Sequence, residues 1–175
     1  LYWEDAAAVA ERVLTTDELK DYVDSQVPSA PGPADGEYWS YWDRPPALRL
    51  RELLARRLMR DHIARLPDGE YAFEDMLDND GVRDVALRIA LKLKIDGDRL
   101  ALDFSGTSPA CAGPVNISRA TAIAACYVAL KHLFPDVPAN AGVLDAVDVV
   151  LPDGLVISAD RPRPVGGYTE TILRM

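Results

Sequence analysis

The polar residues best placed to do chemistry surround a loop of small residues between a predicted strand and a predicted helix. The loop follows Asp103, contains Asn116 and ends at Ser118, the expected N-cap of the helix. Backbone N–H groups in such a loop, with the positive end of a helix dipole, can stabilise an anion or a carbonyl oxygen. A structural alternative stays open, in which Asn116 and Ser118 cap the helix, the glycines form turns and Asp103 is a solvated strand residue.

The histidines and cysteines do not form a recognisable metal or nucleophile motif. His62 and His132 stand far apart, and no Cys-x-x-Cys or His-Glu-x-x-His sequence is present. We expect His62 to face solvent and His132 to interact with the carbonyls that end its helix. Cys111 and Cys126 are too few for a disulfide framework, so the predicted compartment is the reducing cytoplasm. We therefore predict no metal site within this chain.

The charge pattern bears on the class of partner. The 175 residues carry a net charge of -9 and 49% are hydrophobic, which is typical of a globular chain. Such acidity argues against non-specific binding to nucleic acid, and no apolar run reaches the roughly 18–20 residues of a membrane span. Acidic residues dominate residues 1–46, whereas arginines dominate 47–66. This contrast predicts that the acidic arm docks, either on the arginine-rich helix or on a partner, unless both are simply solvated faces.

The first 46 residues are interpreted as a helical arm followed by a linker. Asp5 is a candidate N-cap for an alanine-rich helix, and Thr15 and Glu18 have the spacing of a capping box. Residues 28–46 are too rich in proline and glycine to continue a helix, and they also carry a cluster of Tyr and Trp. The chain therefore divides into this arm, residues 1–46, and a folded region, residues 47–175. The chain begins with Leu1 rather than Met, consistent with processing, truncation or a piece of a longer polypeptide.

The sequence predicts that the folded region, residues 47–175, is an α+β unit. Leucines recur at helical spacing over residues 47–66, and apolar residues alternate with polar ones over 85–95, as in a strand with one buried face. Asp96-Gly97 predicts a turn into a returning strand that buries Leu100, Leu102 and Phe104. The nearly all-apolar run Ala120–Leu130 predicts one long buried helix against these antiparallel hairpins. A second hairpin is expected over residues 147–151 and 155–158.

Four sequence blocks resemble those of hydantoinase B and 5-oxoprolinase-type subunits, which are also similar to a large subunit of acetone and acetophenone carboxylases. The blocks, in order over residues 66–175, are LPDGEYAFEDMLDNDG, GDRLALDFSGTSPACAGPVNIS, VPANAGVLDAVDVVLPDG and RPRPVGGYTETILRM. The family pattern carries over to Asp103, Gly106, Asn116 and residues 140–142. Many members have Arg-Pro after the third block, where this chain has Asp-Ala at 145–146.

The resemblance implies ATP-driven work on a carbonyl group. An A-type partner subunit would bind ATP with magnesium and phosphorylate an amide or ketone oxygen, which makes the carbonyl a better electrophile. The B-type subunit would complete hydrolysis of a cyclic amide, or carboxylation. Asp103 and Asn116 are then the candidate catalytic residues. Candidate substrate-binding residues are Gly106, Ser118, Asn140 and Gly142.

B-type subunits run to several hundred residues, with divalent-metal motifs in an N-terminal part that this sequence does not contain. We therefore expect this chain to be the C-terminal portion of such a subunit, cytoplasmic, oligomeric and inactive alone. One alternative is a non-catalytic assembly module derived from the family. Another is an independent small enzyme that uses Asp103 and a histidine.

Overall fold

The computed structural model describes residue 10 and residues 14–26 and 46–175. The elements in order are α2 (Thr16–Gln26), α3 (Pro46–Ile63), β1 (Gly69–Leu77), β2 (Leu87–Asp96), β3 (Arg99–Asp103), α4 (Arg119–Leu133), the 3₁₀ helix η3 (Ala141–Leu144), β4 (Val147–Val150) and α5 (Tyr168–Leu173). The predicted helix over residues 5–14 and the linker over 28–46 lie almost wholly outside the described residues. None of the described helices is long and apolar enough to cross a membrane.

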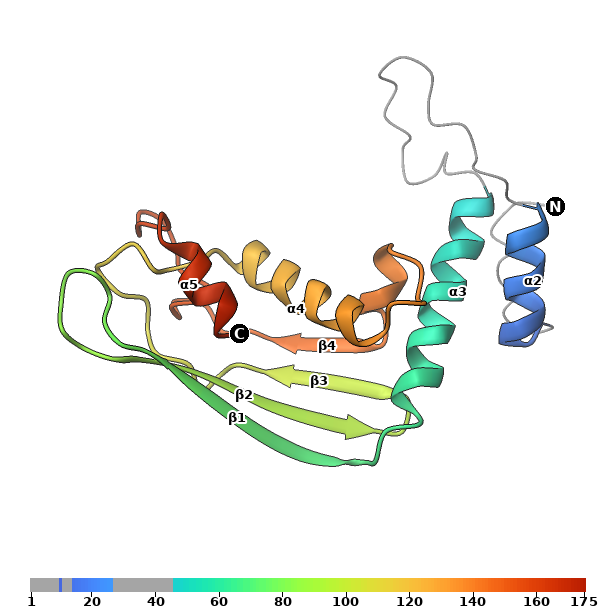
Figure 1. Ribbon diagram of the computed structural model, residues 1–175, viewed down its shortest axis with the longest axis horizontal. Helices are drawn as coiled ribbons and strands as arrows, with labels where there is room; N and C mark the ends of the chain where they lie inside the picture. Colours follow the sequence, from blue (N-terminus) through green and yellow to red (C-terminus); the bar gives the residue numbers. More distant parts are fainter. Residues whose placement is uncertain (1–9, 11–13, 27–45) are drawn as a thin grey trace, which may run out of the picture.

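The strands form one mixed sheet in the order β1-β2-β3-β4 (Figure 1). β2 and β3 pair antiparallel around a turn in which Gly97 has φ +59°, so the hairpin predicted from the alternation is confirmed. β3 and β4 pair parallel, because α4 carries the chain back across the sheet between them. The α+β class is therefore confirmed, with one parallel strand pair among antiparallel ones.

One strand prediction was half wrong, since β4 forms but its hairpin partner does not, and one strand was missed. The second hairpin does not form, since residues 155–158 make turns and only an isolated bridge joins Leu155 to Pro109. In addition, β1 was not predicted at all. Most of its residues are exposed, so its sequence shows no alternation of buried and solvated positions. Its pairing with β2 depends on backbone hydrogen bonds that leave no pattern in the side chains.

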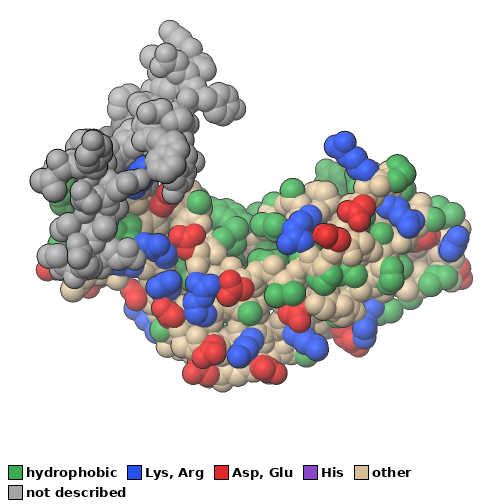
Figure 2. All heavy atoms as spheres, turned by 180° about the vertical axis from the view of Figure 1, so that it is seen from behind, with side chains coloured by type: hydrophobic (Ala, Val, Ile, Leu, Met, Phe, Trp, Pro, Cys, Tyr) green, Lys and Arg blue, Asp and Glu red, His purple; other side chains and the backbone are tan. Residues whose placement is uncertain are grey.

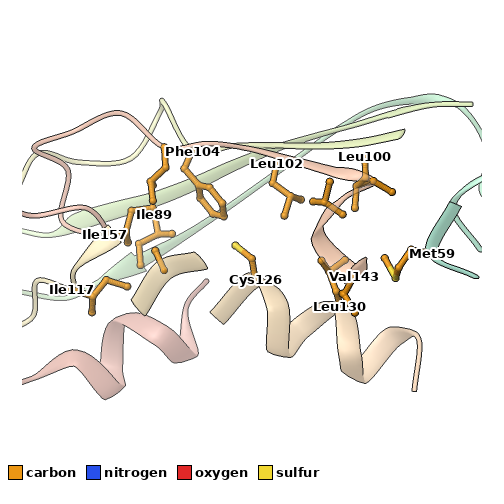
Figure 3. Packing of buried hydrophobic residues seen from close by; sticks show 14 of the residues in the cluster. Met59, Ile89, Leu100, Leu102, Phe104, Ile117, Cys126, Leu130, Val143 and Ile157 are labelled. Carbon is orange, nitrogen blue, oxygen red and sulfur yellow. The ribbon is translucent and has the colours of Figure 1, made fainter. Parts of the chain in front are cut away.

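The main core lies between the sheet and α4. Ile89 of β2 and Leu100 and Leu102 of β3 are buried on the face that the alternation predicted, and Phe104 continues it. Figure 3 shows Cys126 and Leu130 of α4 between the helix and this face of the sheet. The opposite face carries charged residues of β2 and β3, so the sheet is covered on one face only within the described residues.

The helix α4 is less buried than predicted. Ala122, Cys126 and Leu130 are buried along one stripe, but Val128 is 52% exposed and Leu133 is 70% exposed. A helix that is apolar on all sides normally has packing partners on all sides. Among the described residues, α4 packs on the sheet and on η3, but Val128 and Leu133 border an open groove beside the sheet, so the prediction of a fully buried helix is wrong for this side of it.

Helices α2 and α3 stand side by side across the end of the sheet opposite α5 (Figure 1). The predicted capping box at the start of α2 is confirmed: the backbone N–H of Thr15 donates to Glu18 Oε2 at 2.8 Å, and that of Glu18 donates to Thr15 Oγ1 at 3.3 Å. Leu19 of α2 and Leu54 of α3 share a second, smaller core. Arg57 of α3 donates to the carbonyl oxygens of Ala10 and Leu14, so this arginine contacts the arm through backbone groups.

Candidate functional site: the loop between β3 and α4

Asp103 lies at the end of β3 on the sheet face opposite the core. Its Oδ1 accepts a hydrogen bond of 2.8 Å from the backbone N–H of Ser105, and the carboxylate is half-buried. Hydrogen bonds from the hydroxyl and the backbone of Ser105, with a smaller contribution from the charge of Lys92, hold the pKa of Asp103 below its usual value. Asp103 is therefore an ionised carboxylate at neutral pH, partly open to solvent beside the loop.

The first part of the loop is fastened to β2. The Gly106 carbonyl accepts a hydrogen bond of 2.8 Å from Arg88 Nη2, and Arg88 also lies 3.5 Å from Glu74 of β1. The buried hydroxyl of Thr107 bonds both backbone groups of Ala90. Because a Cβ on residue 106 would lie 3.2 Å from the Cβ of Ala90, Gly106 allows the loop to approach the strand closely.

Asn116 is fully buried and fixes the second part of the loop. Its Oδ1 accepts from the backbone N–H of Cys111 at 2.9 Å. Its Nδ2 lies within hydrogen-bonding distance of the carbonyl oxygens of Cys111, Gly113 and Pro164, at 3.1, 2.9 and 3.0 Å. The polar atoms of this side chain are thus used within the chain, and they join the loop to the C-terminal segment.

The C-terminal segment makes further contacts with the same loop. The backbone N–H of Gly167 donates to the Pro114 carbonyl at 2.8 Å, and the Thr171 hydroxyl donates to the Val115 carbonyl. The sequence blocks around residues 103–118 and 161–175 therefore meet in space.

Asp80 completes this arrangement, although it is not among the predicted site residues. It is only 3% exposed, and its Oδ1 accepts from the backbone N–H groups of Arg83 at 2.6 Å and Val82 at 2.8 Å. Its Oδ2 accepts from the N–H of Gly113 at 3.3 Å. The sequence Asp-Asn-Asp-Gly at 78–81 is typical of turns stabilised by side-chain to backbone bonds, but the partner at Gly113 is distant in the chain.

Ser118 is the N-cap of α4, as predicted. Its backbone is extended, with φ -77° and ψ 156°, and its side chain accepts from the backbone N–H of Thr121 at 3.2 Å. The hydroxyl is exposed, so the N-terminus of α4 opens to solvent beside the loop.

The other predicted site residues, Asn140 and Gly142, lie at the far end of α4. Fifteen residues of helix separate the two ends, a length of about 22 Å. Asn140 is the N-cap of η3, where its Oδ1 accepts from the Gly142 N–H at 2.9 Å and its Nδ2 donates to the Arg51 carbonyl of α3 at 3.1 Å. It also lines a hollow of about 460 Å³ beside α2 and α3. Asp103, Gly106, Asn116 and Ser118 thus lie in or next to one loop, with Asp103 on the open face of the sheet and Ser118 at the start of α4, whereas Asn140 and Gly142 lie elsewhere.

Replacing Gly142 by alanine should detach η3 from α3. A Cβ at this position would lie 2.1 Å from the Glu52 carbonyl oxygen, so the backbone of one element must move. Overpacking of this kind typically costs about 1–3 kcal/mol. We expect faster hydrogen exchange of α3 amides and a lower free energy of unfolding. Gly166→Ala is the matched control, because its Cβ would meet nothing closer than 3.9 Å, and equal effects of the two substitutions would contradict this prediction.

The histidines and cysteines are used for packing and local bonding. His62 is half-buried, stacks on Phe134 and lies 2.8 Å from Asp136 Oδ2, so the expectation that it faces solvent was wrong. His132 Nδ1 lies 2.8 Å from the Val128 carbonyl within its helix, as expected. Burial raises the pKa of the Cys126 thiol to about 11. Among the described residues, no three His, Cys, Asp or Glu side chains lie close enough together to hold a metal ion.

Folding stability should fall in acid because two carboxylates are held ionised. Hydrogen bonds from the Arg83 and Val82 backbones lower the pKa of Asp80, and the hydrogen bond from His62 lowers that of Asp136. A carboxyl group with a lowered folded-state pKa stabilises the fold above its unfolded pKa, about 3.9, and loses this contribution as the pH falls through the folded value. We expect urea midpoints to drop below about pH 4, and less steeply in Asp136→Asn. Equal pH slopes for the variant and the wild type would rule out this role of Asp136.

Comparisons with known proteins agree on one family. The model of the Hydantoinase B/oxoprolinase family matches residues 52–175. A protein named as the B component of a D-/L-hydantoinase, from Pseudomonas sp. (strain NS671), is 34% identical over 122 residues, which cover 63% of this chain and 21% of that protein. The 5-oxoprolinase 1 of Arabidopsis thaliana is 35% identical over 106 residues, covering 58% of this chain and 8% of that protein.

Two solved structures share the fold. The ATP-dependent caprolactamase from Pseudomonas jessenii superposes with a TM-score of 0.62 at 26% identity, over 74% of this chain and 23% of that one. Nucleotide-free acetone carboxylase does so with a TM-score of 0.61 at 20% identity, over 88% and 21% of the respective chains, and this likeness concerns the fold alone. The matched residues of this chain cover only about a fifth of the length of the hydantoinase B component from Pseudomonas sp.. By the match over residues 52–175, the chain belongs to the hydantoinase B/oxoprolinase family.

Proposed function

We propose that this chain is a component of an ATP-dependent complex that hydrolyses a cyclic amide, with carboxylation of a ketone as the related possibility. The supporting observation is the family match over residues 52–175, which includes the whole loop between β3 and α4. The names of two matched proteins refer to hydantoinase and caprolactamase activities, both directed at cyclic amides. The complex would be cytoplasmic, because its reaction uses ATP.

The chemistry of the proposal divides between this chain and a partner. An unstrained lactam carbonyl is a poor electrophile, so an A-type partner would use ATP with magnesium to phosphorylate its oxygen. This chain would then help to position the attacking group and to stabilise negative charge. The described residues offer no metal-ligand cluster, so a divalent metal would be bound by other parts of the complex.

Within this proposal the loop residues have different tasks. Asp103 is ionised and partly open to solvent, so it can accept a proton or orient a water molecule. Asn116 is buried and bonded within the chain, so it positions the loop and does not itself contact the substrate. Gly106 fastens the loop to β2 through Arg88, Ser118 presents a hydroxyl at the N-terminus of α4, and Asn140 and Gly142 hold η3 against α3.

The test combines the chain with the product of a neighbouring A-type gene. ADP release is measured with 5-oxoproline, a hydantoin or an aryl ketone. We expect one of these compounds to stimulate ATP hydrolysis and Asp103→Asn to reduce the stimulated rate. Asp96 is an exposed aspartate on the same face of the sheet, and Asp96→Asn should leave the stimulated rate unchanged. No stimulation by any of the compounds would overturn the proposed function.

A non-catalytic assembly module is the second candidate. The observation that favours it is the exposed apolar side of α4, with Val128 and Leu133, which suits a packing interface better than a reaction site. Size-exclusion chromatography with the A-type partner separates the two candidates. A stable complex that shows no substrate-stimulated ATP hydrolysis would support the module.

A further inference from the structure

Strand β1 is an edge of the sheet along its whole length. All nine of its residues pair with β2 on one side, and among the described residues no strand pairs with its other side. Proteins commonly protect such an edge with lysine, proline or a bulge. The sequence of β1, GEYAFEDML, contains neither lysine nor proline, and its register with β2 is uninterrupted. The open edge can therefore accept another strand.

The backbone groups at the open edge belong to the even-numbered residues of β1. On β2, the backbone groups of Arg88 and Ala90 bond to Ser108 and Thr107, on the side away from β1. Successive residues of a strand turn these groups to opposite sides, so the odd-numbered residues of β2 face β1. In the register of the two strands, they lie opposite the odd-numbered residues of β1. The groups left at the open edge are those of Glu70, Ala72, Glu74 and Met76.

A second, antiparallel copy of β1 fits this edge in one register. Even-numbered residues must face even-numbered ones for their backbone groups to bond, so the twofold axis passes through one residue of the strand. Centring the pair on Ala72 opposes Glu70 and Glu74, and centring it on Glu74 opposes that carboxylate to itself. Centring the pair on Phe73 opposes no like charges, because Glu74 then faces Ala72. Centres nearer either end leave much of β1 unpaired.

The side chains of β1 suit the register centred on Phe73. Phe73 is 61% exposed and faces its own copy there, in the type of pair that brings side chains closest. Two acidic side chains of β1 are already paired with arginines of their own chain: Glu74 lies 3.5 Å from Arg88, and Asp75 lies 3.1 Å from Arg174. Figure 2 shows acidic and basic side chains mixed along the lower border of the molecule, where β1 lies in Figure 1. The net charge of -9 is therefore not concentrated on this edge.

We propose that two copies of this chain associate through β1, as an antiparallel pair centred on Phe73 that joins their sheets into one. A second copy is the partner because the edge is complementary to itself: the backbone groups match and the carboxylates face uncharged residues. Association requires neither ATP nor substrate, so it is independent of the proposed catalytic function.

The first test is disulfide trapping in the full chain. Phe73→Cys places a thiol opposite its own copy in the pair. Tyr71→Cys is the matched control, because Tyr71 is 45% exposed on the same face but its two copies would lie about 13 Å apart along the strands. The native Cys111 and Cys126 are buried, and the unsubstituted chain gives the background. After mild oxidation, we expect several-fold more covalent dimer from Phe73→Cys than from Tyr71→Cys on a non-reducing gel. Equal trapping, preferential trapping at position 71, or no dimer from either variant would overturn the proposal.

The second test uses opposite charges at one exposed position. Ala72 faces Glu74 of the other copy in the proposed pair, whereas within its own chain it lies opposite Lys92. Ala72→Glu therefore adds repulsion between copies and attraction within the chain, and Ala72→Lys does the reverse.

The two variants should rank in opposite orders in two measurements. By sedimentation equilibrium, we expect the dimer of Ala72→Glu to dissociate at a several-fold higher concentration than that of Ala72→Lys. In urea, at concentrations where both are monomeric, Ala72→Glu should unfold at the higher midpoint. A wild-type chain that stays monomeric at every concentration, or one dissociation constant shared by both variants, would reject the pairing through β1. So would a dimer that Phe73→Cys does not trap, which would assign the association to another surface.

Discussion

Alanine at position 113 is expected to abolish the native contact between the loop before α4 and the loop between β1 and β2. A Cβ on Gly113 would lie 1.5 Å from the backbone carbonyl oxygen of Asp80, which is far inside any tolerable contact. The obstacle is backbone, so no side-chain rotation can relieve it. When the loop before α4 moves away, the hydrogen bond from the Gly113 N–H to the Asp80 carboxylate is also broken. We expect a loss of about 4 kcal/mol or more in the free energy of unfolding, measured by urea titration and circular dichroism.

The control for this prediction is a glycine in a nearby segment with room for a methyl group. Gly166→Ala places its Cβ 3.9 Å from Pro114, an ordinary van der Waals distance, and should change the free energy of unfolding little. A Gly113→Ala protein that unfolds at the wild-type urea concentration would show that the two loops are not in this contact.

Alanine at position 116 should be nearly as damaging, for a different reason. The side chain of Asn116 is the common partner of backbone groups of Cys111, Gly113 and Pro164, and Cys111 and Gly113 are buried. Each buried group left without a partner costs about 1–3 kcal/mol, and the substitution orphans several at once. We expect a loss of about 3 kcal/mol or more, with rapid hydrogen exchange in residues 111–116 and in the C-terminal segment.

Asn79→Ala is the matched control, because Asn79 is exposed and accepts a single local bond from the Gly81 N–H. It should leave hydrogen exchange around Cys111 unchanged. If Asn116→Ala keeps wild-type stability but abolishes substrate-stimulated ATP hydrolysis, Asn116 acts on the substrate directly, and its assignment as a positioning residue is wrong.

Much of the local structure could be predicted because its causes lie within a few residues. The capping box at Thr15 and Glu18 and the N-cap at Ser118 are formed by side chains three residues from their partners. The β2–β3 hairpin follows from alternation on a half-buried sheet and from a glycine that tolerates a positive φ. The ordered sequence blocks indicated the family that the match over residues 52–175 then established.

The site itself could be predicted only in part. The sequence singled out Asn116 by its place in the loop before the helix, but not Asp80, although Asp80 lies in another of the blocks, because its bond to Gly113 crosses 33 residues of chain. It also grouped Asn140 and Gly142 with the loop residues, because order in a sequence gives no distance in space. A helix about 22 Å long separates them.

The amino-acid sequence alone determined the α+β class, the one-sided β2–β3 hairpin, the N-caps at Thr15 and Ser118 and the family resemblance. Only the tertiary structure decided that β4 pairs parallel, that β1 forms without a side-chain pattern and that Asp80 and Asn116 fasten one loop. It also decided that α4 keeps an apolar face open. Propensity, capping and alternation act between near neighbours. Strand pairing, close glycine contacts and the covering of an apolar face depend on segments brought together from distant parts of the chain.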